Sequence, residues 1–233
     1  MARTLFEKIW DRHVVATEEG ESLLYIDRAL IHEGSSHAFD AIREQKRSLF
    51  RPRQVFAFND HYVPTHGRSR GVDGIAAPDI RHMVLQLEAN AREHGITHFG
   101  IDHPEQGILH VVPPDQGITQ PGLVMVGADS HTSTHGAFGN LAFGVGASEI
   151  MHVMATQTLW QRKPGTLRIV VDGELGFGVS AKDLILAIIA RLARVGHHAA
   201  DRQRLFGIGA PGHHRRNRRR VDFDGLVELR ACI

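Results

Sequence analysis

The 233-residue chain is 42% hydrophobic and 23% charged, a composition typical of a globular protein that buries a core. These values exclude an intrinsically disordered polymer. The longest apolar run, residues 184–190, is far shorter than the roughly 20 residues that cross a bilayer. Acidic residues near the N-terminus interrupt any signal-peptide pattern. We therefore expect a cytoplasmic protein without a membrane partner.

The net charge of +1 conceals a basic segment near the C-terminus. Residues 194–220 hold eight arginines, one acidic residue and no lysine, and apolar periodicity stops where they begin. An arm that neutralises nucleic-acid phosphates has this composition. A shifted reading frame is the favoured interpretation, because out-of-frame GC-rich codons give arginine without lysine. We expect residues 1–193 to form a partial α/β domain and residues 194–233 to form an aberrant, disordered tail.

Helices and strands alternate through the first half of the chain. Amphipathic spacing predicts helices over residues 5–10 and 38–45, and strands over 22–26 and 55–58. A third helix is predicted over 78–94, with Pro78 at its start and Gly95 after its end.

The second half continues the alternation. Strands are predicted over residues 108–112, 123–126 and 167–171, and a helix is predicted over 148–160. A further helix begins at Ser180, with Asp183 as its capping partner, and we expect it to be buried because residues 184–189 are apolar on nearly all sides. This order predicts an α/β fold with a largely parallel sheet.

Acid–histidine pairs follow two of the predicted strands. Asp60 and His61 come after residues 55–58, and Asp129-Ser130-His131 comes after residues 123–126. Ligands of α/β sheets collect at the carboxyl ends of strands, and an aspartate can orient a histidine and stabilise its charged form. His110 lies within a third apolar segment, either as a core residue or as a member of the same site.

Two classes of chemistry fit these residues. One is acid–base catalysis on a small anionic substrate, and the other is metal-dependent hydrolysis with aspartate and histidine ligands. The second lacks a recognised ligand spacing. His94 and His98 are four residues apart behind Glu93, but the helix ends at Gly95, so we interpret both as surface residues, like His82.

Several separated motifs resemble the aconitase superfamily. They are NDHYVPT at residues 59–65 and GADSHTSTHGAFG at residues 127–139. The sequences TLFEKIW (4–10), LYIDR (24–28) and ATQTLW (155–160) are similar to its isopropylmalate dehydratase branch. The resemblance covers residues 1–193 and implies an incomplete aconitase-like N-terminal domain of three α/β layers.

The resemblance implies a hydro-lyase reaction. This branch converts 2-isopropylmalate to 3-isopropylmalate by dehydration and rehydration, a step of leucine biosynthesis. A 4Fe–4S cluster with an open iron position acts as a Lewis acid on the substrate. The implied partners are a dicarboxylate substrate and a small subunit, which carries the serine base that removes the carbon-bound proton.

The resemblance also implies roles for seven residues of this chain. Asp60 and His61 match the pair that donates a proton to the leaving hydroxyl. The other five match the hydrogen-bonded network around the cluster (His110, Asp129 and His131) and contacts to substrate (Ser130 and His32).

The sequence departs from the family in its cysteines. The family's three cluster ligands lie beyond the counterpart of position 193, whereas this chain has one cysteine, Cys232, to which we assign no ligand role. We therefore expect the chain alone to bind no cluster and to be inactive. Alternatives are a hydro-lyase acting on homoaconitate or a methylmalate, and a non-catalytic domain with a nucleic-acid-binding tail.

Overall fold

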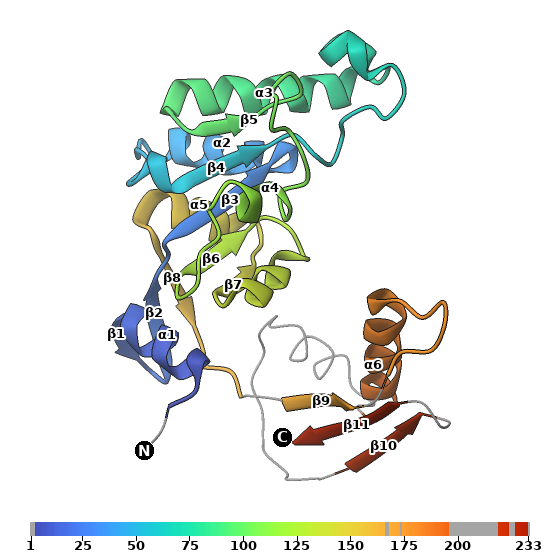
Figure 1. Cartoon of the computed structure of the whole chain (residues 1–233). Coiled ribbons are helices and arrows are strands. Elements are labelled where there is room, and N and C mark those ends of the chain that lie inside the picture. The colour runs from blue at the N-terminus through green and yellow to red at the C-terminus, as the bar shows by residue number, and fades with distance from the viewer. Residues whose placement is uncertain (1–2, 166–167, 173, 196–218, 224–226, 233) are drawn as a thin grey trace. The chain divides into compact units, whose positions relative to one another are not determined.

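The computed structural model describes residues 3–165, 168–172, 174–195, 219–223 and 227–232. The chain divides into two compact units, Met1–Gln161 and Arg162–Ile233. Figure 1 shows the elements of each. The predicted division at residue 193 stays a prediction, and residues 196–218 and 224–226 of the predicted tail lie outside the described residues.

A parallel sheet of five strands, in the order β5-β4-β3-β6-β7, forms the centre of the first unit. The chain adds β4 and β5 on one side of β3, then returns to add β6 and β7 on the other. The strand order therefore reverses between β3 and β6, and such a reversal opens a crevice at the carboxyl ends of the strands. The strands are β3 (Arg28–His32), β4 (Val55–Phe58), β5 (Thr97–Phe99), β6 (Val124–Gly127) and β7 (Leu141–Gly144).

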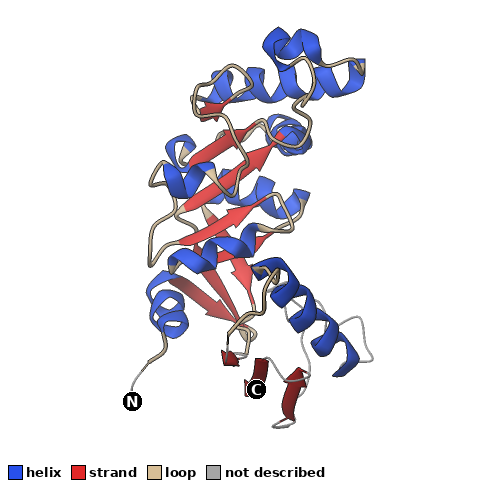
Figure 2. Cartoon of the chain, turned by 45° about the vertical axis from the view of Figure 1, so that its right-hand side comes forward, coloured by secondary structure: helices blue, strands red, loops and turns tan. Residues whose placement is uncertain are grey.

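Both faces of this sheet are buried, so the strands are apolar without alternation. In β3, Ala29 and Ile31 point into one core and Leu30 points into the other. The first core is closed by α2 (Ser36–Glu44), α3 (Pro78–His94) and α5 (Ala147–Thr156). The second is closed by residues 109–118, which include α4 (Val112–Asp115). Figure 2 shows the strands between helices, which gives the expected three layers.

A second, antiparallel sheet combines β1 (Val14–Glu18), β2 (Glu21–Tyr25) and β8 (Thr158–Gln161). Helix α1 (Leu5–His13) begins at a capping box, in which the Thr4 hydroxyl accepts from the Glu7 backbone N–H and the Glu7 carboxylate accepts from the Thr4 N–H. Four short 3₁₀ helices complete the described part of this unit: η1 (Glu33–Ser35), η2 (Pro52–Gln54), η3 (Arg68–Gly74) and η4 (Thr132–Phe138).

Two predicted elements of this unit are wrong. Residues 108–111 form turns instead of a strand, because Pro113 and Pro114 lack the N–H groups of a sheet ladder and favour the first turn of α4. The helix predicted over 148–160 ends at Thr156. Gln157 adopts a left-handed conformation with φ 58°, and residues 158–161 pair with β2.

The second unit contains β9 (Arg168–Asp172), α6 (Ala181–Val195), β10 (Arg219–Phe223) and β11 (Val227–Cys232), with antiparallel strands in the order β10-β11-β9. Strands β10 and β11 lie within the predicted tail, and the expected disorder of that tail stays a prediction. The Asp183 carboxylate caps α6 at Ser180, as predicted.

The predicted burial of α6 is wrong. Its apolar residues Ile185 and Leu186 are 44% and 52% exposed, because no element within the described residues covers them. The length and apolar content of each described helix also fall short of what a membrane span requires.

Candidate active site

Three adjacent strands of the parallel sheet end at one edge, and each delivers a polar side chain there. His32 is the last residue of β3, His61 follows β4, and Asp129 follows β6. Because β3 lies between β4 and β6, these residues meet at the reversal of strand order. All seven residues singled out from the sequence lie in this region, and His110 reaches it from a turn.

Small residues let the loop after β6 fold tightly around Asp129. A side chain at Gly127 would collide with the Thr132 hydroxyl, and a Cβ at Gly144 would lie 2.6 Å from the Asp129 carbonyl oxygen. The Thr132 hydroxyl donates to that carbonyl at 2.7 Å, and the Asp129 carboxylate accepts from the His131 backbone N–H at 2.7 Å. The carboxylate is therefore fixed in position before any ligand binds.

His61 bridges two carboxylates. Its Nδ1–H donates to Asp60 Oδ1 at 2.6 Å, and its Nε2 lies 3.1 Å from Asp129 Oδ2. The second oxygen of Asp60 accepts from the Leu109 backbone N–H at 2.8 Å. Since a carboxylate can only accept, both nitrogens of His61 donate and the ring carries a positive charge.

The electrostatics agree with this assignment. Burial acts to lower the pKa of His61, but the hydrogen bonds and charges of Asp60 and Asp129 outweigh it and raise the pKa above its ordinary value. Burial acts to raise the pKa of Asp129, whereas hydrogen bonds from His110 and the His131 backbone N–H hold it well below its usual range. An imidazolium between two carboxylates is the result.

A buried chain of side chains lies behind Asp129. His110 Nε2 is 2.7 Å from Asp129 Oδ1, His110 Nδ1 is 3.1 Å from His135 Nε2, and His135 Nδ1 is 2.9 Å from the Thr119 hydroxyl. Sequence reasoning missed His135 and Thr119. The position of His135 in the same small-residue run as His131 was the available signal, whereas nothing local marks Thr119.

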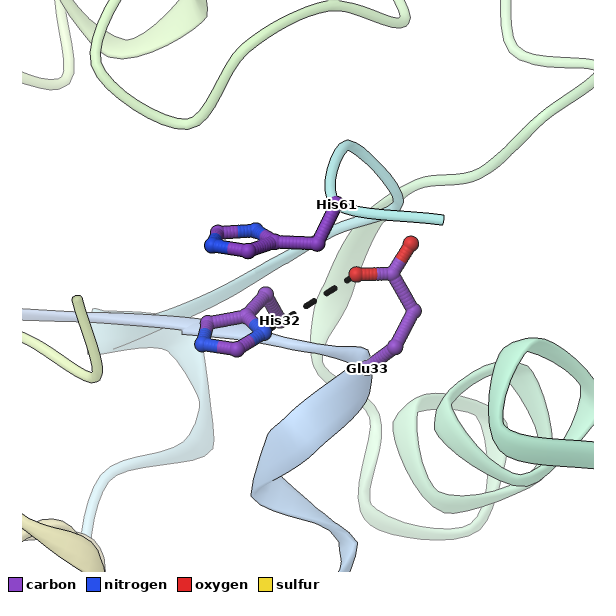
Figure 3. A group of neighbouring side chains, drawn as sticks. All are labelled: His32, Glu33 and His61. Atoms are coloured by element: carbon purple, nitrogen blue, oxygen red, sulfur yellow. Dashed lines mark ion pairs between the residues drawn. The ribbon is translucent and has the colours of Figure 1, made fainter. Parts of the chain in front are cut away.

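His32 stacks on His61, with ring centroids 4.0 Å apart and planes 14° from parallel (Figure 3). Its Nε2–H donates to the Ala128 carbonyl at 2.8 Å, and its Nδ1 accepts from the Gly34 N–H at 3.1 Å, so the ring is neutral. Sequence reasoning also missed Glu33, which is fully buried beside this pair. Its oxygens have no hydrogen-bond partner among the described residues.

His32, Glu33 and His61 offer ligand atoms that all lie within 4.8 Å of one another, a spacing that could hold a metal ion. All four ring nitrogens of the two histidines are already hydrogen-bonded, however. A cation would have to displace those bonds. The geometry therefore favours proton chemistry over the metal-dependent hydrolase considered from the sequence.

Ser130 and His131 form the solvent-facing side of the site. The Ser130 hydroxyl lies 3.2 Å from His131 Nδ1, and the His131 side chain is 81% exposed. Both are accessible to a ligand.

His94 and His98, expected at the surface, are half-buried. His98 lies on β5, where its Nε2 is 2.6 Å from Asn59 Oδ1 and burial lowers its pKa. His94 stacks on Phe39, while His82 is exposed as predicted.

The residues of this chain do not by themselves fit a 4Fe–4S cluster. Such clusters are held by several cysteine thiolates, and the only cysteine of the sequence is Cys232. It belongs to the second unit, whereas the site described above belongs to the first.

Comparisons with known proteins agree with the motifs of the site. The profile of the aconitase family (aconitate hydratase) matches residues 7–199. The 3-isopropylmalate dehydratase large subunit of Oceanobacillus iheyensis is 54% identical over 191 residues, which cover 81% of this chain and 40% of that protein. The chain thus spans about two fifths of the length of this relative. Since the family profile matches most of the sequence, including every residue at the three strand ends, the chain belongs to the aconitase family.

Proposed function

We propose that this chain forms part of the large subunit of a 3-isopropylmalate dehydratase, which isomerises 2-isopropylmalate to 3-isopropylmalate by dehydration and rehydration in leucine biosynthesis. The charged His61 between Asp60 and Asp129 is the observation that carries the proposal. The similarity to the Oceanobacillus iheyensis large subunit supports 2-isopropylmalate as the proposed substrate.

His61 is suited to protonate a leaving hydroxyl. Hydroxide is a poor leaving group, so its departure needs a general acid. The Asp60 hydrogen bond is the shorter of the two at 2.6 Å and holds Nδ1, while the Nε2–H donates to Asp129 over the longer distance of 3.1 Å, so a substrate oxygen beside Nε2 can compete for that proton. After it donates, the Nε2 lone pair would face the Asp129 carboxylate, and this repulsion favours taking the proton back during rehydration.

The proposed reaction also needs a base and a Lewis acid, and both lie outside this chain. The small subunit supplies the base that removes the carbon-bound proton. A 4Fe–4S cluster, held by residues outside this chain, would supply Lewis-acid chemistry to the substrate oxygens, since a single cysteine does not fit as its ligand set. Ser130 and His32 contact the substrate, and His110, Asp129 and His131 hold the proton donor in place.

A chimaera tests the proposal. Residues 7–199 replace the matched segment of the Oceanobacillus iheyensis large subunit, which is co-expressed with its small subunit in a leucine auxotroph that lacks the large subunit. We expect growth without leucine. A chimaera that folds but gives no growth would argue for another substrate, such as homoaconitate or a methylmalate.

Variants of the chimaera test the assigned donor. His61→Gln removes the acid and should abolish growth, whereas His82→Gln changes an exposed helix residue and should leave growth unchanged. Equal growth of both variants would remove His61 from the mechanism.

A further inference from the structure

The segment that joins α2 to β4 is strongly basic. Residues 45–59 contain no acidic residue, and four of them carry a positive charge: Lys46, Arg47, Arg51 and Arg53. All four side chains are exposed, and none is in an ion pair within the part of the chain that the structure describes. Residues 46–53, the basic loop, therefore present four uncompensated charges to solvent.

The backbone of the basic loop is held in place by the first unit. Leu49 is buried in the core beneath α2, α3 and α5. The Phe50 N–H donates to the Met154 carbonyl at 3.0 Å, and the Arg47 N–H donates to the Ile42 carbonyl at 3.0 Å. Because Leu49 takes the inner position, the next side chain, Phe50, faces outward and is 57% exposed. The charges thus surround a fixed, exposed aromatic ring.

This combination fits a single strand of nucleic acid. One exposed apolar side chain is common at a protein surface, but here the Arg51 guanidinium lies over the Phe50 ring, 5.3 Å from its centroid. Proteins that bind single strands combine cations for the phosphates with aromatic rings on which bases stack. A duplex keeps its base faces inside the stack, and an acidic peptide uses the charges alone, so neither needs the ring.

The basic loop lies away from the candidate active site. It leads into the amino end of β4, whereas Asp60 and His61 follow the carboxyl end of this strand, about 13 Å further along. Residues 1–161 hold 13 lysines and arginines against 19 acidic residues. The net charge of this unit therefore repels a polyanion, and attraction must come from a local surface.

We propose that the basic loop binds single-stranded nucleic acid, with its four cations on phosphates and Phe50 stacked on a base. The proposal does not rest on the proposed function, because the two surfaces occupy opposite edges of the sheet.

Fluorescence anisotropy of a labelled oligouridine with the full chain tests the proposal. We expect binding that weakens as salt rises. Replacing all four cations of the basic loop with glutamine should weaken binding at least tenfold and reduce the salt slope by up to about 3, since each phosphate contact to a single strand contributes about 0.7. Binding equal to wild type in this variant would overturn the proposal.

The C-terminal arginines require a matched control, because they are a second source of positive charge. A variant with four of them replaced by glutamine (Arg215, Arg216, Arg218 and Arg219) loses the same charge elsewhere in the chain. We expect it to keep the affinity that the loop variant loses. The reverse result would assign binding to the C-terminal segment and reject the basic loop.

Phe50 variants separate a nucleic acid from an acidic protein. Phe50→Ala keeps every charge and should weaken oligouridine binding by about fivefold or more, the effect of losing one stacked base, whereas Phe50→Trp should restore it. Unchanged binding in Phe50→Ala, or displacement of oligouridine by polyglutamate as readily as by unlabelled oligouridine, would show a surface that recognises charge alone and would contradict the proposal.

Discussion

Asp129 joins three histidines from separate parts of the first unit. One carboxylate oxygen lies 2.7 Å from His110 Nε2 and the other lies 3.1 Å from His61 Nε2, while the His131 backbone N–H fixes its orientation. The sequence placed Asp129 and His131 after the same strand, which marked them as a pair. It could not reveal that Asp129 also contacts His61, because that contact spans 68 positions of the chain.

His135 is expected to make stability depend on pH. Its folded pKa of about 4 lies below the unfolded value, so between pH 6.5 and 4 the unfolded chain binds a proton that the native chain does not. Stability from this group therefore falls as the pH falls, by up to about 3 kcal/mol. Urea unfolding of wild type and His135→Phe at pH 7 and pH 4.5 should show a smaller pH effect in the variant.

The exposed His82 is the control for this measurement. His82→Phe should retain the wild-type dependence on pH. An unchanged dependence in His135→Phe would mean that the buried ring titrates normally.

At the scale of elements, a buried ion pair fastens α1 to the sheets. His13, the last residue of α1, lies 2.7 Å from the Ile9 carbonyl through Nδ1 and 2.8 Å from Asp27 Oδ2 through Nε2. Asp27 also accepts from the Val124 N–H at the start of β6. Two acceptors require a charged ring, and the hydrogen bond to Asp27 raises the pKa of His13 despite burial.

Asp27→Asn should therefore destabilise the first unit by about 3 kcal/mol, since it leaves a buried charge without its partner. The raised pKa of His13 means that the pair stabilises fully below pH 6.5 and loses its effect as the pH rises through the folded pKa. Thermal unfolding should show a larger effect of the variant at pH 6 than at pH 9.

Asp40→Asn is the control: it breaks the exposed pair with Arg43 and should cost less than about 1 kcal/mol. Equal losses from both variants would contradict this account.

Helices and strands that are delimited by proline, glycine or a clear change in the apolar pattern could be predicted from the sequence. Elements without such residues could not. Helix α3 matches its predicted range because Pro78 and Gly95 delimit it, and β4 matches as well. The central strand β3 was missed, since residues buried on both faces show no alternation. Strand β3 ends at His32 and so brings this ring against His61. The positions of the two residues in the sequence do not predict this contact.

At the scale of the whole molecule, alternation of helices and strands was enough to predict a parallel α/β sheet, but the environment of α6 was not predictable. An apolar helix is buried only where another surface covers it, and Ile185 and Leu186 remain exposed within the described residues. Residues 196–218 lie outside the described residues, so the shifted reading frame and the nucleic-acid arm both stay predictions.

The chain has one cysteine, which cannot by itself hold a 4Fe–4S cluster. We therefore predict that the chain alone binds no cluster. Anaerobic incubation with iron and sulfide should give no cluster absorbance and no turnover of 2-isopropylmalate. A full-length family member treated in the same way is the positive control. A stable absorbance band with bound iron and sulfide in this chain would contradict the assignment of no ligand role to Cys232.

The protonation of His61 tests the central claim most directly, because the proposed proton donor requires a charged ring between Asp60 and Asp129. Nitrogen-15 NMR of the chain should show both ring nitrogens of His61 protonated up to a titration midpoint above 6.5, as the raised pKa requires. Asp129→Asn should lower that midpoint by removing one of the two facing charges. A His61 midpoint at or below 6.5, unaffected by Asp129→Asn, would contradict the account.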